Sequence, residues 1–186
     1  MTGSCPILAV LDGCRTSIIM IAIETSVATD EIIDTRRLRL RRMQEDDRSS
    51  LADMGWLDAE RMMIRSVRTP WPWGFLAVTL NESGEFCGIC GLLRQQMDHG
   101  DEVELAYHLR PRYHGRGIAT EAARGVMEYA FENLGLRRIV SLIRPDNLPS
   151  RRVAVKNGLS HEQDVVFHGD VHGMHVILKQ DREAIR

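Results

Sequence analysis

Hydrophobic and polar residues alternate along parts of this chain. The segment TRRLRLRRM, which begins at Thr35, places Leu38 and Leu40 on one side and arginines on the other. This pattern is typical of a half-exposed strand, and its charged side favours a position at the edge of a sheet. The run Arg137–Ile143 (RRIVSLI) is almost continuously apolar. It predicts a strand that is buried on both faces.

A second repeat, of three to four residues, begins at Ile118 and continues through Ala122 and Val126. It predicts an amphipathic helix of at least four turns, with Gly135 as its cap. Turn residues and shorter patterns supply the other elements. In chain order we predict helices at Glu45–Met54 and Leu57–Val67, strands at Phe75–Leu80, Glu85–Leu93 and Glu102–Leu109, the long helix, the strand at Arg137–Ile143, a helix between Asn147 and Gly158, and a closing hairpin around Asp164–His168 and Met174–Lys179.

Size and composition limit the class of protein. The 186 residues suffice for one domain with a substantial core and are too few for two of ordinary size. With 44% hydrophobic and 27% charged residues, the composition is that of a soluble globular protein. The formal net charge of -2 argues against a general polyanion binder, so we expect no nucleic-acid partner.

The first 33 residues differ in pattern from the rest. We expect residues 1–33 to be an N-terminal extension, either disordered or a start-site artefact with Met20 as the true start. The apolar stretch Ile18–Ile23 is too short to span a bilayer, and no basic residue precedes the apolar run Ile7–Leu11, so a secretory signal fits poorly. We therefore predict one folded domain over residues 34–180, a tail over residues 181–186, a cytoplasmic location and no membrane partner.

Cysteine and histidine spacing does not predict a metal site. Cys87 and Cys90 form a CxxC, but residues three apart in a strand point to opposite faces, and no second pair completes a zinc site. We interpret them as small buried strand residues. His168, His172 and His175 are separated by a turn and lack helical spacing, so we interpret them as surface histidines. The four cysteines are too few for a disulfide framework, which favours a reducing compartment.

A glycine-containing loop precedes the long helix. Gly115 and Gly117 stand directly before Ile118, where the first backbone N–H groups of the helix are free and the helix dipole is positive. This combination predicts a cradle for a phosphate or pyrophosphate. A nucleoside-triphosphate loop is excluded because GxxxxGK followed by Ser or Thr is absent, and a dinucleotide loop fits poorly because its third glycine is missing.

The spacing Arg112-x-x-Gly115-x-Gly117 resembles the (Gln/Arg)-x-x-Gly-x-(Gly/Ala) pyrophosphate motif of the GNAT superfamily of N-acetyltransferases. The resemblance covers about Asp34 to Lys179. It implies an α+β fold in α/β/α layers, with a mixed, mostly antiparallel sheet of six or seven strands, about four helices, and two central strands that splay into a V. Three strings are similar to the ribosomal-protein N-terminal acetyltransferase branch: Glu104–Tyr107, Gly115–Ala122 and Asn147–Gly158.

Acetyl-CoA is the cosubstrate that this resemblance implies. The pantetheine arm would complete the unpaired edge of the splayed central strand, and the loop amides would meet the pyrophosphate. One or both of the loop arginines would add charge. The implied cofactor-binding residues are Tyr107, His108, Leu109, Arg112, Tyr113, His114, Gly115, Arg116, Gly117, Ile118, Ala119, Thr120, Asn147 and Ser150.

The catalytic candidates also follow from the resemblance. Glu104 and Glu102 lie on one face of the central strand, and a carboxylate near the thioester can accept the proton of the amine. We choose Glu104, with a solvent-facing strand residue as the alternative. Because Ala154 stands where many members have a tyrosine, we assign Ser150 to a hydrogen bond with the leaving sulfur and Asn147 to the cofactor or a water. Helix capping is the alternative role for both.

The sequence therefore predicts an N-acetyltransferase that moves an acetyl group from acetyl-CoA to a primary amine by direct attack. The acceptor is a protein N-terminal α-amine or a small-molecule amine, and no metal is needed. A non-catalytic acyl-CoA-binding sensor and a dinucleotide oxidoreductase are the rival hypotheses. The oligomeric state stays open, with a homodimer as the usual prior.

Overall fold

The computed structural model of the protein describes residues 32–54, 66 and 68–183. Within these residues, strands and helices follow one another in the mixed order that an α+β fold requires. The elements are β1 (Ile32–Asp34), β2 (Leu38–Arg41), α1 (Asp47–Ala52), β3 (Gly74–Leu80), β4 (Phe86–Met97), β5 (Gly100–Leu109), the 3-10 turn η1 (Pro111–Tyr113), α3 (Ile118–Glu132), β6 (Arg138–Ile143), α4 (Leu148–Lys156), β7 (Ser160–Phe167), β8 (Asp170–Leu178) and α5 (Lys179–Glu183).

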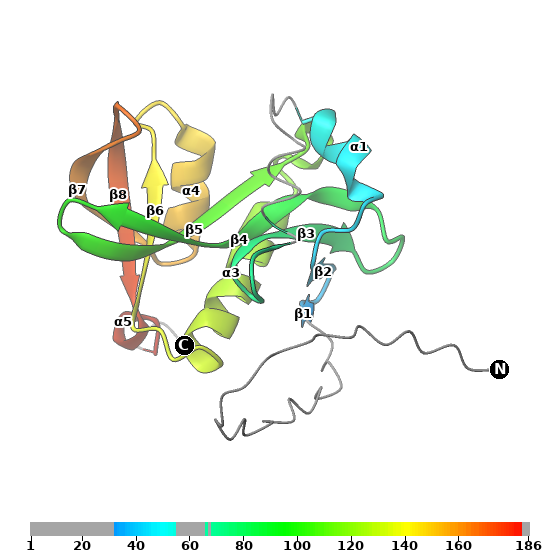
Figure 1. Cartoon of the computed structure of the whole chain (residues 1–186), viewed down its shortest axis with the longest axis horizontal. Coiled ribbons are helices and arrows are strands. Elements are labelled where there is room, and N and C mark those ends of the chain that lie inside the picture. Colours follow the sequence, from blue (N-terminus) through cyan, green and yellow to red (C-terminus); the bar gives the residue numbers. More distant parts are fainter. Residues whose placement is uncertain (1–31, 55–65, 67, 184–186) are drawn as a thin grey trace, which may run out of the picture.

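The strands form an eight-stranded sheet in the order β1-β2-β3-β4-β5-β6-β8-β7. In Figure 1, β7 and β8 lie at one side of the molecule and β1 to β3 at the other. Neighbouring strands are antiparallel except β5 and β6, which run parallel. The sheet is therefore mixed and mostly antiparallel, as predicted, with eight described strands where six or seven were expected.

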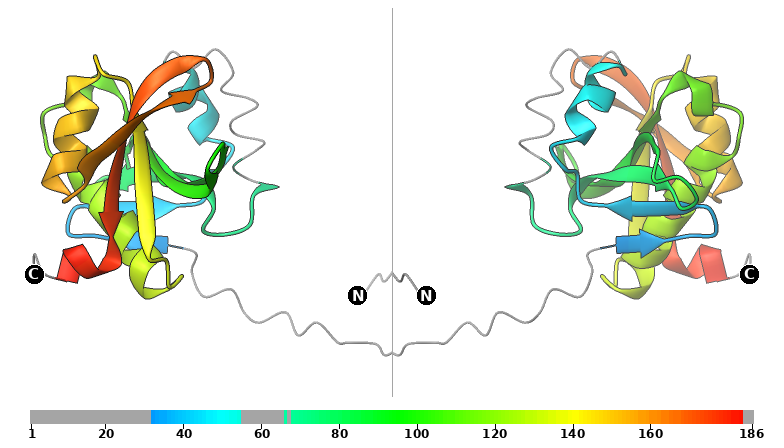
Figure 2. Two further views of the ribbon diagram at one scale, coloured as in Figure 1. Left: turned by 90° about the vertical axis from the view of Figure 1, so that its left-hand side faces the viewer. Right: turned by 90° about the vertical axis from the view of Figure 1, so that its right-hand side faces the viewer.

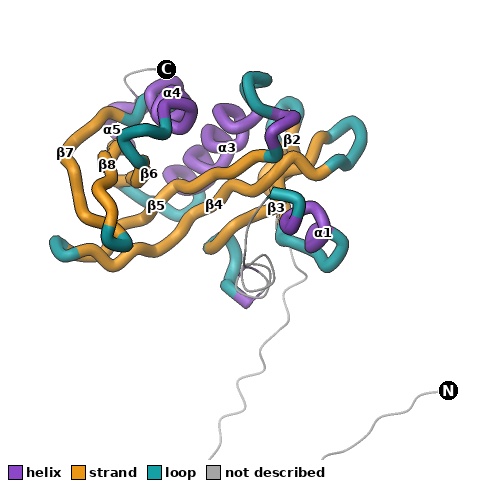
Figure 3. The backbone as a smooth tube through the Cα atoms, turned by 90° about the horizontal axis from the view of Figure 1, so that it is seen from above, coloured by secondary structure: helices purple, strands orange, loops and turns teal. Residues whose placement is uncertain are grey.

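Helices cover both faces of this sheet. In Figure 3, α3 and α4 lie on one side of the strands and α1 on the other. The main core lies under α3, where Met127 and Phe131 pack with strand residues such as Leu105. A smaller core under α1 contains Leu51 and Ile89. Burying these apolar side chains contributes about 25 cal/mol for each Å² removed from water, which stabilises the three layers.

The parallel pair β5 and β6 separates soon after it forms. Its ladder has one register pair, Glu104 with Val140. Directly beyond it, the Ser141 hydroxyl donates to the Leu105 carbonyl at 2.7 Å, so a side chain replaces the next ladder bond. The rest of β5 pairs with β4 alone, down to Leu109. This fork is the V-shaped gap that the sequence predicts between two central strands.

The N-terminal end of α3 is held by residues from the β1–β2 connection. The backbone N–H and Nε of Arg37 donate to Glu121 at 2.7 and 2.6 Å, and the Thr35 hydroxyl donates to it at 2.8 Å. Burial alone would raise the pKa of the Glu121 carboxyl, but these hydrogen bonds outweigh it and lower that pKa. Arg37 also donates to the Arg116 carbonyl at 3.2 Å, so one side chain joins the helix start to the glycine loop.

The opposite end of α3 contacts the last helix. Figure 2 shows α5, in red, beside the C-terminal part of α3. Lys179 donates to the Phe131 carbonyl at 2.9 Å, and Arg182 pairs with Glu128. Both ends of the long helix are thus attached to segments far away in the sequence, which fixes its position against the sheet.

The predicted edge strand lies one place inside the sheet. Leu38 and Leu40 are fully buried, as the alternation requires, but β1 pairs with the far side of β2. β1 begins at Ile32, two residues before the expected start of the domain. Three residues are too few to show an alternation of their own, which is why the sequence pattern did not reveal this strand.

The two long hairpins extend beyond their predicted ends. β4 and β5 continue pairing through Gln95–Glu102 to Met97–Gly100, beyond the predicted strand ends at Leu93 and Glu102. β7 starts at Ser160 although most of its residues are exposed. In both places the backbone ladder continues where the side chains face water, so no apolar alternation marks the strand. His175 is 3% exposed and is not the surface residue that its sequence context suggested.

Two expectations fall outside the described residues: the N-terminal extension up to residue 31, and most of the helix predicted at Leu57–Val67. The other predicted helices are present, with α1 shorter than expected. In the described ranges, no helix is long and apolar enough to cross a bilayer.

Candidate active site

The glycine loop forms an open helix start. Gly115 and Gly117 have φ angles of 73° and 75°, in the left-handed region that other residues rarely adopt. Gly117 is the N-cap of α3, and no side chain caps the first backbone N–H groups of the helix. A Cβ at Gly115 would meet nothing within 4 Å. The loop therefore presents main-chain donors and the positive end of a 15-residue helix to open space.

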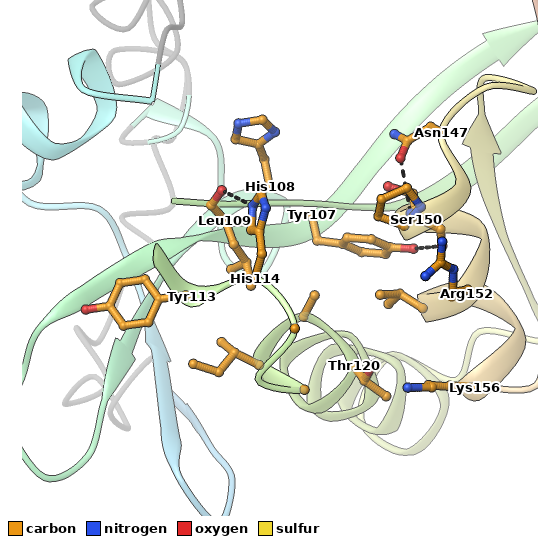
Figure 4. Close-up of a pocket in the computed structure, with 16 residues that line it drawn as sticks. Tyr107, His108, Leu109, Tyr113, His114, Thr120, Asn147, Ser150, Arg152 and Lys156 are labelled. Atoms are coloured by element: carbon orange, nitrogen blue, oxygen red, sulfur yellow. Dashed lines mark hydrogen bonds between the residues drawn. The ribbon is translucent and has the colours of Figure 1, made fainter. Parts of the chain in front are cut away.

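A cavity of about 470 Å³ lies in front of this helix start, between β5, the loop and α4. Figure 4 shows its side chains, with Tyr107 and Ser150 close together and Lys156 beside Thr120. The described residues that line it include no aspartate or glutamate. The lining consists of Tyr107, His108, Leu109, Tyr113, His114, Gly115, Gly117, Ile118, Ala119, Thr120, Asn147, Pro149, Ser150, Arg152, Val153 and Lys156.

All the predicted cofactor-binding residues line the cavity except Arg112 and Arg116. The guanidinium of Arg112 pairs with Glu85 at the far side of the loop. The guanidinium of Arg116 lies over the Tyr113 ring, 5.7 Å from its centre. The structure thus brings the loop backbone to the cavity and leaves the two arginine side chains outside its lining.

The start of α4 closes one end of the cavity. Asn147 is the N-cap, and its side-chain oxygen accepts from the Ser150 backbone N–H at 3.1 Å. Pro149 occupies the first turn, where a missing N–H is harmless. Across the fork, the Tyr107 hydroxyl donates to the Ser150 carbonyl at 2.9 Å, and burial raises the pKa of that phenol. β5 and α4 are thereby joined at the point where the strands separate.

Glu104 lies where the fork closes, on the sheet face opposite the cavity. Its neighbour Leu105 packs in the main core under α3, and successive strand residues point to opposite faces. The Glu104 residue is 8% exposed, and Gln95 Nε2 donates to its carboxylate at 2.6 Å. Burial raises the pKa of this carboxyl, although hydrogen bonds from Gln95 and the Leu142 backbone lower it in part.

Glu102, on the same face of β5, belongs to a charged network. It accepts from Arg138 Nε at 3.1 Å and lies 3.2 Å from His99 Nε2. Arg138 also pairs with Glu162 at 2.8 Å. Glu102 is thus held by charged partners, whereas the side-chain partner of Glu104 among the described residues is the neutral amide of Gln95.

Comparison with known proteins identifies this arrangement. A family model described as the acetyltransferase (GNAT) domain matches residues 37–160. The chain belongs to the GNAT acetyltransferase family. It is 30% identical over 149 residues to the uncharacterized protein YkkB of Bacillus subtilis (strain 168), a match covering 70% of this chain and 86% of that protein.

Solved structures show the same GNAT fold. An acetyltransferase from Agrobacterium tumefaciens str. C58 superposes with a TM-score of 0.70 at 23% identity, covering 91% of this chain and 99% of that one. The ribosomal-protein-S5-alanine acetyltransferase from Vibrio fischeri superposes with a TM-score of 0.63 at 14% identity, covering 81% and 97%. The predicted family, fold and enzyme class, an N-acetyltransferase, are thus confirmed.

The cysteines and histidines considered above as metal ligands, Cys87, Cys90, His168, His172 and His175, lie apart from the cavity lining. Cys87 and Cys90 are fully buried, as predicted, and burial raises both thiol pKa values, that of Cys87 to about 11. His175 packs edge-on against His161 with ring centres 5.5 Å apart. Among the residues that the structure describes, no three metal-ligating side chains come together.

Sequence reasoning missed several residues of the GNAT site. Gln95 lies outside both predicted strands on either side of it, yet its side chain donates to Glu104. Arg152 and Lys156 were not assigned at all, although both line the cavity. Their spacing of four residues on the helix predicted after Asn147 was a usable signal, because residues i and i+4 share one face.

Proposed function

We propose that this protein transfers an acetyl group from acetyl-CoA to a primary amine by direct attack. The single observation that carries the proposal is the open start of α3, where Gly117 leaves main-chain donors facing a cavity without carboxylates. The GNAT family uses acetyl-CoA as its donor, so a diphosphate is the expected anion. The lining fits that ligand because it opposes no negative charge to it.

The donor would lie along the free edge of β5. Beyond Glu104, no strand among the described residues pairs with this strand on the β6 side. Backbone groups of Tyr107–Leu109 can therefore pair with the amides of the pantetheine arm. A backbone N–H near Tyr107 would stabilise the oxyanion that develops on the acyl carbonyl. The donor supplies an activated acyl thioester, and the protein supplies its alignment.

Glu104 and Ser150 would handle the proton and the leaving group. Attack by a neutral amine requires a base, and the buried Glu104 carboxylate at the closed end of the fork can take the amine proton directly or through a water. Its raised pKa suits a base that works near neutral pH. The Ser150 hydroxyl lies at the cavity end and would donate a hydrogen bond to the sulfur as the C–S bond breaks.

The acceptor class we favour is a protein N-terminal α-amine. The supporting observation is the likeness of this fold to a ribosomal-protein-S5-alanine acetyltransferase. A small-molecule amine is the other class. An amine of either class would approach Glu104 from the sheet face opposite the cavity.

The deciding experiment measures free CoA release from acetyl-CoA with a panel of amines and N-terminal peptides. We expect release with at least one acceptor, with peptides favoured over small amines. Binding of CoA without release for any acceptor would instead support a non-catalytic sensor. A thermal shift with a nicotinamide cofactor and none with CoA would support an oxidoreductase.

Glu104→Gln provides the matched variant for this assay. It keeps the size and the hydrogen-bonding capacity of the side chain but removes the base, so kcat/KM should fall about 10²- to 10⁴-fold while CoA binding is unchanged. Glu162→Gln, an exposed carboxylate on the same face, serves as the control. Unchanged activity in Glu104→Gln would contradict the assigned base and direct attention to His108, whose imidazole pKa is lowered by burial.

A further inference from the structure

Two cations of α4 line the same cavity as the glycine loop. Arg152 and Lys156 are four residues apart, so they share one face of the helix. Figure 4 shows both side chains on α4, with Lys156 beside Thr120 of α3. The Lys156 carbonyl accepts from Arg124 of α3 at 3.3 Å, which holds the end of α4 next to the first turns of that helix.

Neither cation is neutralised within the described part of the chain. Both residues are exposed, and the structure gives neither side chain a carboxylate partner. Other arginines near the helix starts are engaged, as Arg37 is with Glu121 and Arg110 is with Asp53. Two unpaired cations on a wall without carboxylates form a positive surface that an anion would stabilise.

The cosubstrate of the proposed function carries more than one anionic group. The main-chain donors at Gly117 suit the diphosphate, which leaves the 3′-phosphate of the adenosine ribose without an assigned partner. Lys156 lies at the junction of this cavity with a second one of about 490 Å³, which also includes Gly117, Thr120 and Arg124. The second cavity also contains three carboxylates, and each has an arginine partner: Asp34 with Arg39, Glu121 with Arg37 and Glu128 with Arg182. A monoester phosphate carries nearly two negative charges at pH 7, so cations are its natural partners.

We propose that Arg152 and Lys156 form a second anion site, which binds the 3′-phosphate of coenzyme A while the glycine loop binds the diphosphate. The inference rests on the proposed function, because it assumes that coenzyme A is the ligand. Its consequence is selectivity: the protein distinguishes CoA from dephospho-CoA, which differs by that one phosphate.

Isothermal titration of the full-length protein with CoA and with dephospho-CoA tests the site. We expect wild-type protein to bind CoA at least about tenfold more tightly at low salt, since each charge-assisted hydrogen bond adds affinity. In the double variant Arg152→Gln/Lys156→Gln, CoA affinity should fall to that for dephospho-CoA, whose own affinity should change by less than about twofold. The selectivity should also weaken as salt is added.

Arg151→Gln is the matched control. Arg151 has the same charge on the same helix but does not line the cavity, so the ratio of the two affinities should stay at its wild-type value. Circular dichroism of each variant checks that α4 is intact.

Three outcomes would overturn the inference. Equal affinities in the wild-type protein would show that the 3′-phosphate is not bound. If the double variant loses the same affinity for CoA and for dephospho-CoA, Arg152 and Lys156 bind the diphosphate that both ligands share. If Arg151→Gln also loses the preference for CoA over dephospho-CoA, the preference comes from the overall positive charge of α4 and not from a site at Arg152 and Lys156. If neither ligand binds the wild-type protein, the proposed function fails instead, so the two failures are distinguishable.

Discussion

Single residues decide how the candidate base is tuned. Glu104 is almost fully buried, which disfavours its ionised form, and the Gln95 amide and the Leu142 backbone partly restore it. The titratable groups that face it from the β7–β8 hairpin are His168, in the turn, and His172, on β8, and both favour the carboxylate when they carry a positive charge. In the proposed mechanism Gln95 is a positioning residue, because it contacts Glu104 and would act on the reaction only through that side chain.

Gln95→Leu should raise the pKa of Glu104, because one of the hydrogen bonds that stabilise its carboxylate is lost. The base must be ionised to act, so the acid limb of the kcat/KM profile should move to higher pH. Activity on that limb should be lower by about three- to tenfold, with a nearly unchanged plateau at high pH. Gln96→Leu, at the exposed neighbouring position, is the control. A lower plateau with an unmoved acid limb would show a structural role instead.

At the scale of elements, α3 depends on contacts that are remote in sequence. Arg37 and Glu121 are 84 positions apart, yet their ion pair fixes the helix start and, through the Arg116 carbonyl, the glycine loop. The Glu121 side chain is 18% exposed, so the pair is only partly screened by solvent. The acidic group also lies in the first turn, where the helix dipole favours it.

Glu121→Gln should destabilise the protein by about 1–2 kcal/mol at pH 7, because charge-assisted hydrogen bonds are lost at a partly exposed site. The folded-state pKa of Glu121 is lowered, so its contribution is present above the unfolded-state pKa and disappears as pH falls through the folded-state value. The difference from wild type should therefore shrink in strong acid. Urea unfolding at several pH values measures it, with the exposed Glu132→Gln as control. A difference that is independent of pH would contradict the assignment.

Local patterns predicted the elements that carry their own signals. The period of α3, the glycines before it and the capping residues of α4 are all encoded within a few neighbouring positions, and the structure has them in place. β1 and the polar part of β7 exist because the next strand in the chain pairs with their backbone, so their own residues give no periodic signal. The same limit hid Gln95, whose partner Glu104 is adjacent only across the β4–β5 hairpin. Contacts between elements are the information that a single sequence lacks.

For the whole molecule, the arrangement of layers buries the imidazole ring of His175. His175 on β8 is 3% exposed and faces His161 and the nearby charges of Arg151 and Asp164. Its Nδ1 lies 3.0 Å from the Gly173 carbonyl, a contact that suits a neutral ring donating from Nδ1. Burial, with smaller contributions from His161 and Arg151, lowers the pKa of His175 in the folded protein.

Acid should therefore destabilise the fold through His175. Between the lowered folded-state pKa and the unfolded-state value of about 6.5, only the unfolded chain binds the proton, so stability falls as pH is lowered. In His175→Phe the unfolding free energy should depend less steeply on pH over this window, whatever its absolute value. Denaturant titrations from pH 7.5 to about 5 give the slope. His168→Asn, at an exposed residue with a positive φ, should retain the wild-type slope. A wild-type slope in His175→Phe would contradict the prediction.

The fork between β5 and β6 has a consequence for the order of events in turnover. The cavity lies on the side of α3 and α4, whereas the buried Glu104 side chain lies on the other face of the same sheet. In the proposed mechanism, acetyl-CoA and the amine acceptor therefore enter the site from opposite faces of the sheet. A protein acceptor bound on the Glu104 face would not block the cavity. CoA can then leave and acetyl-CoA can bind without release of the acceptor.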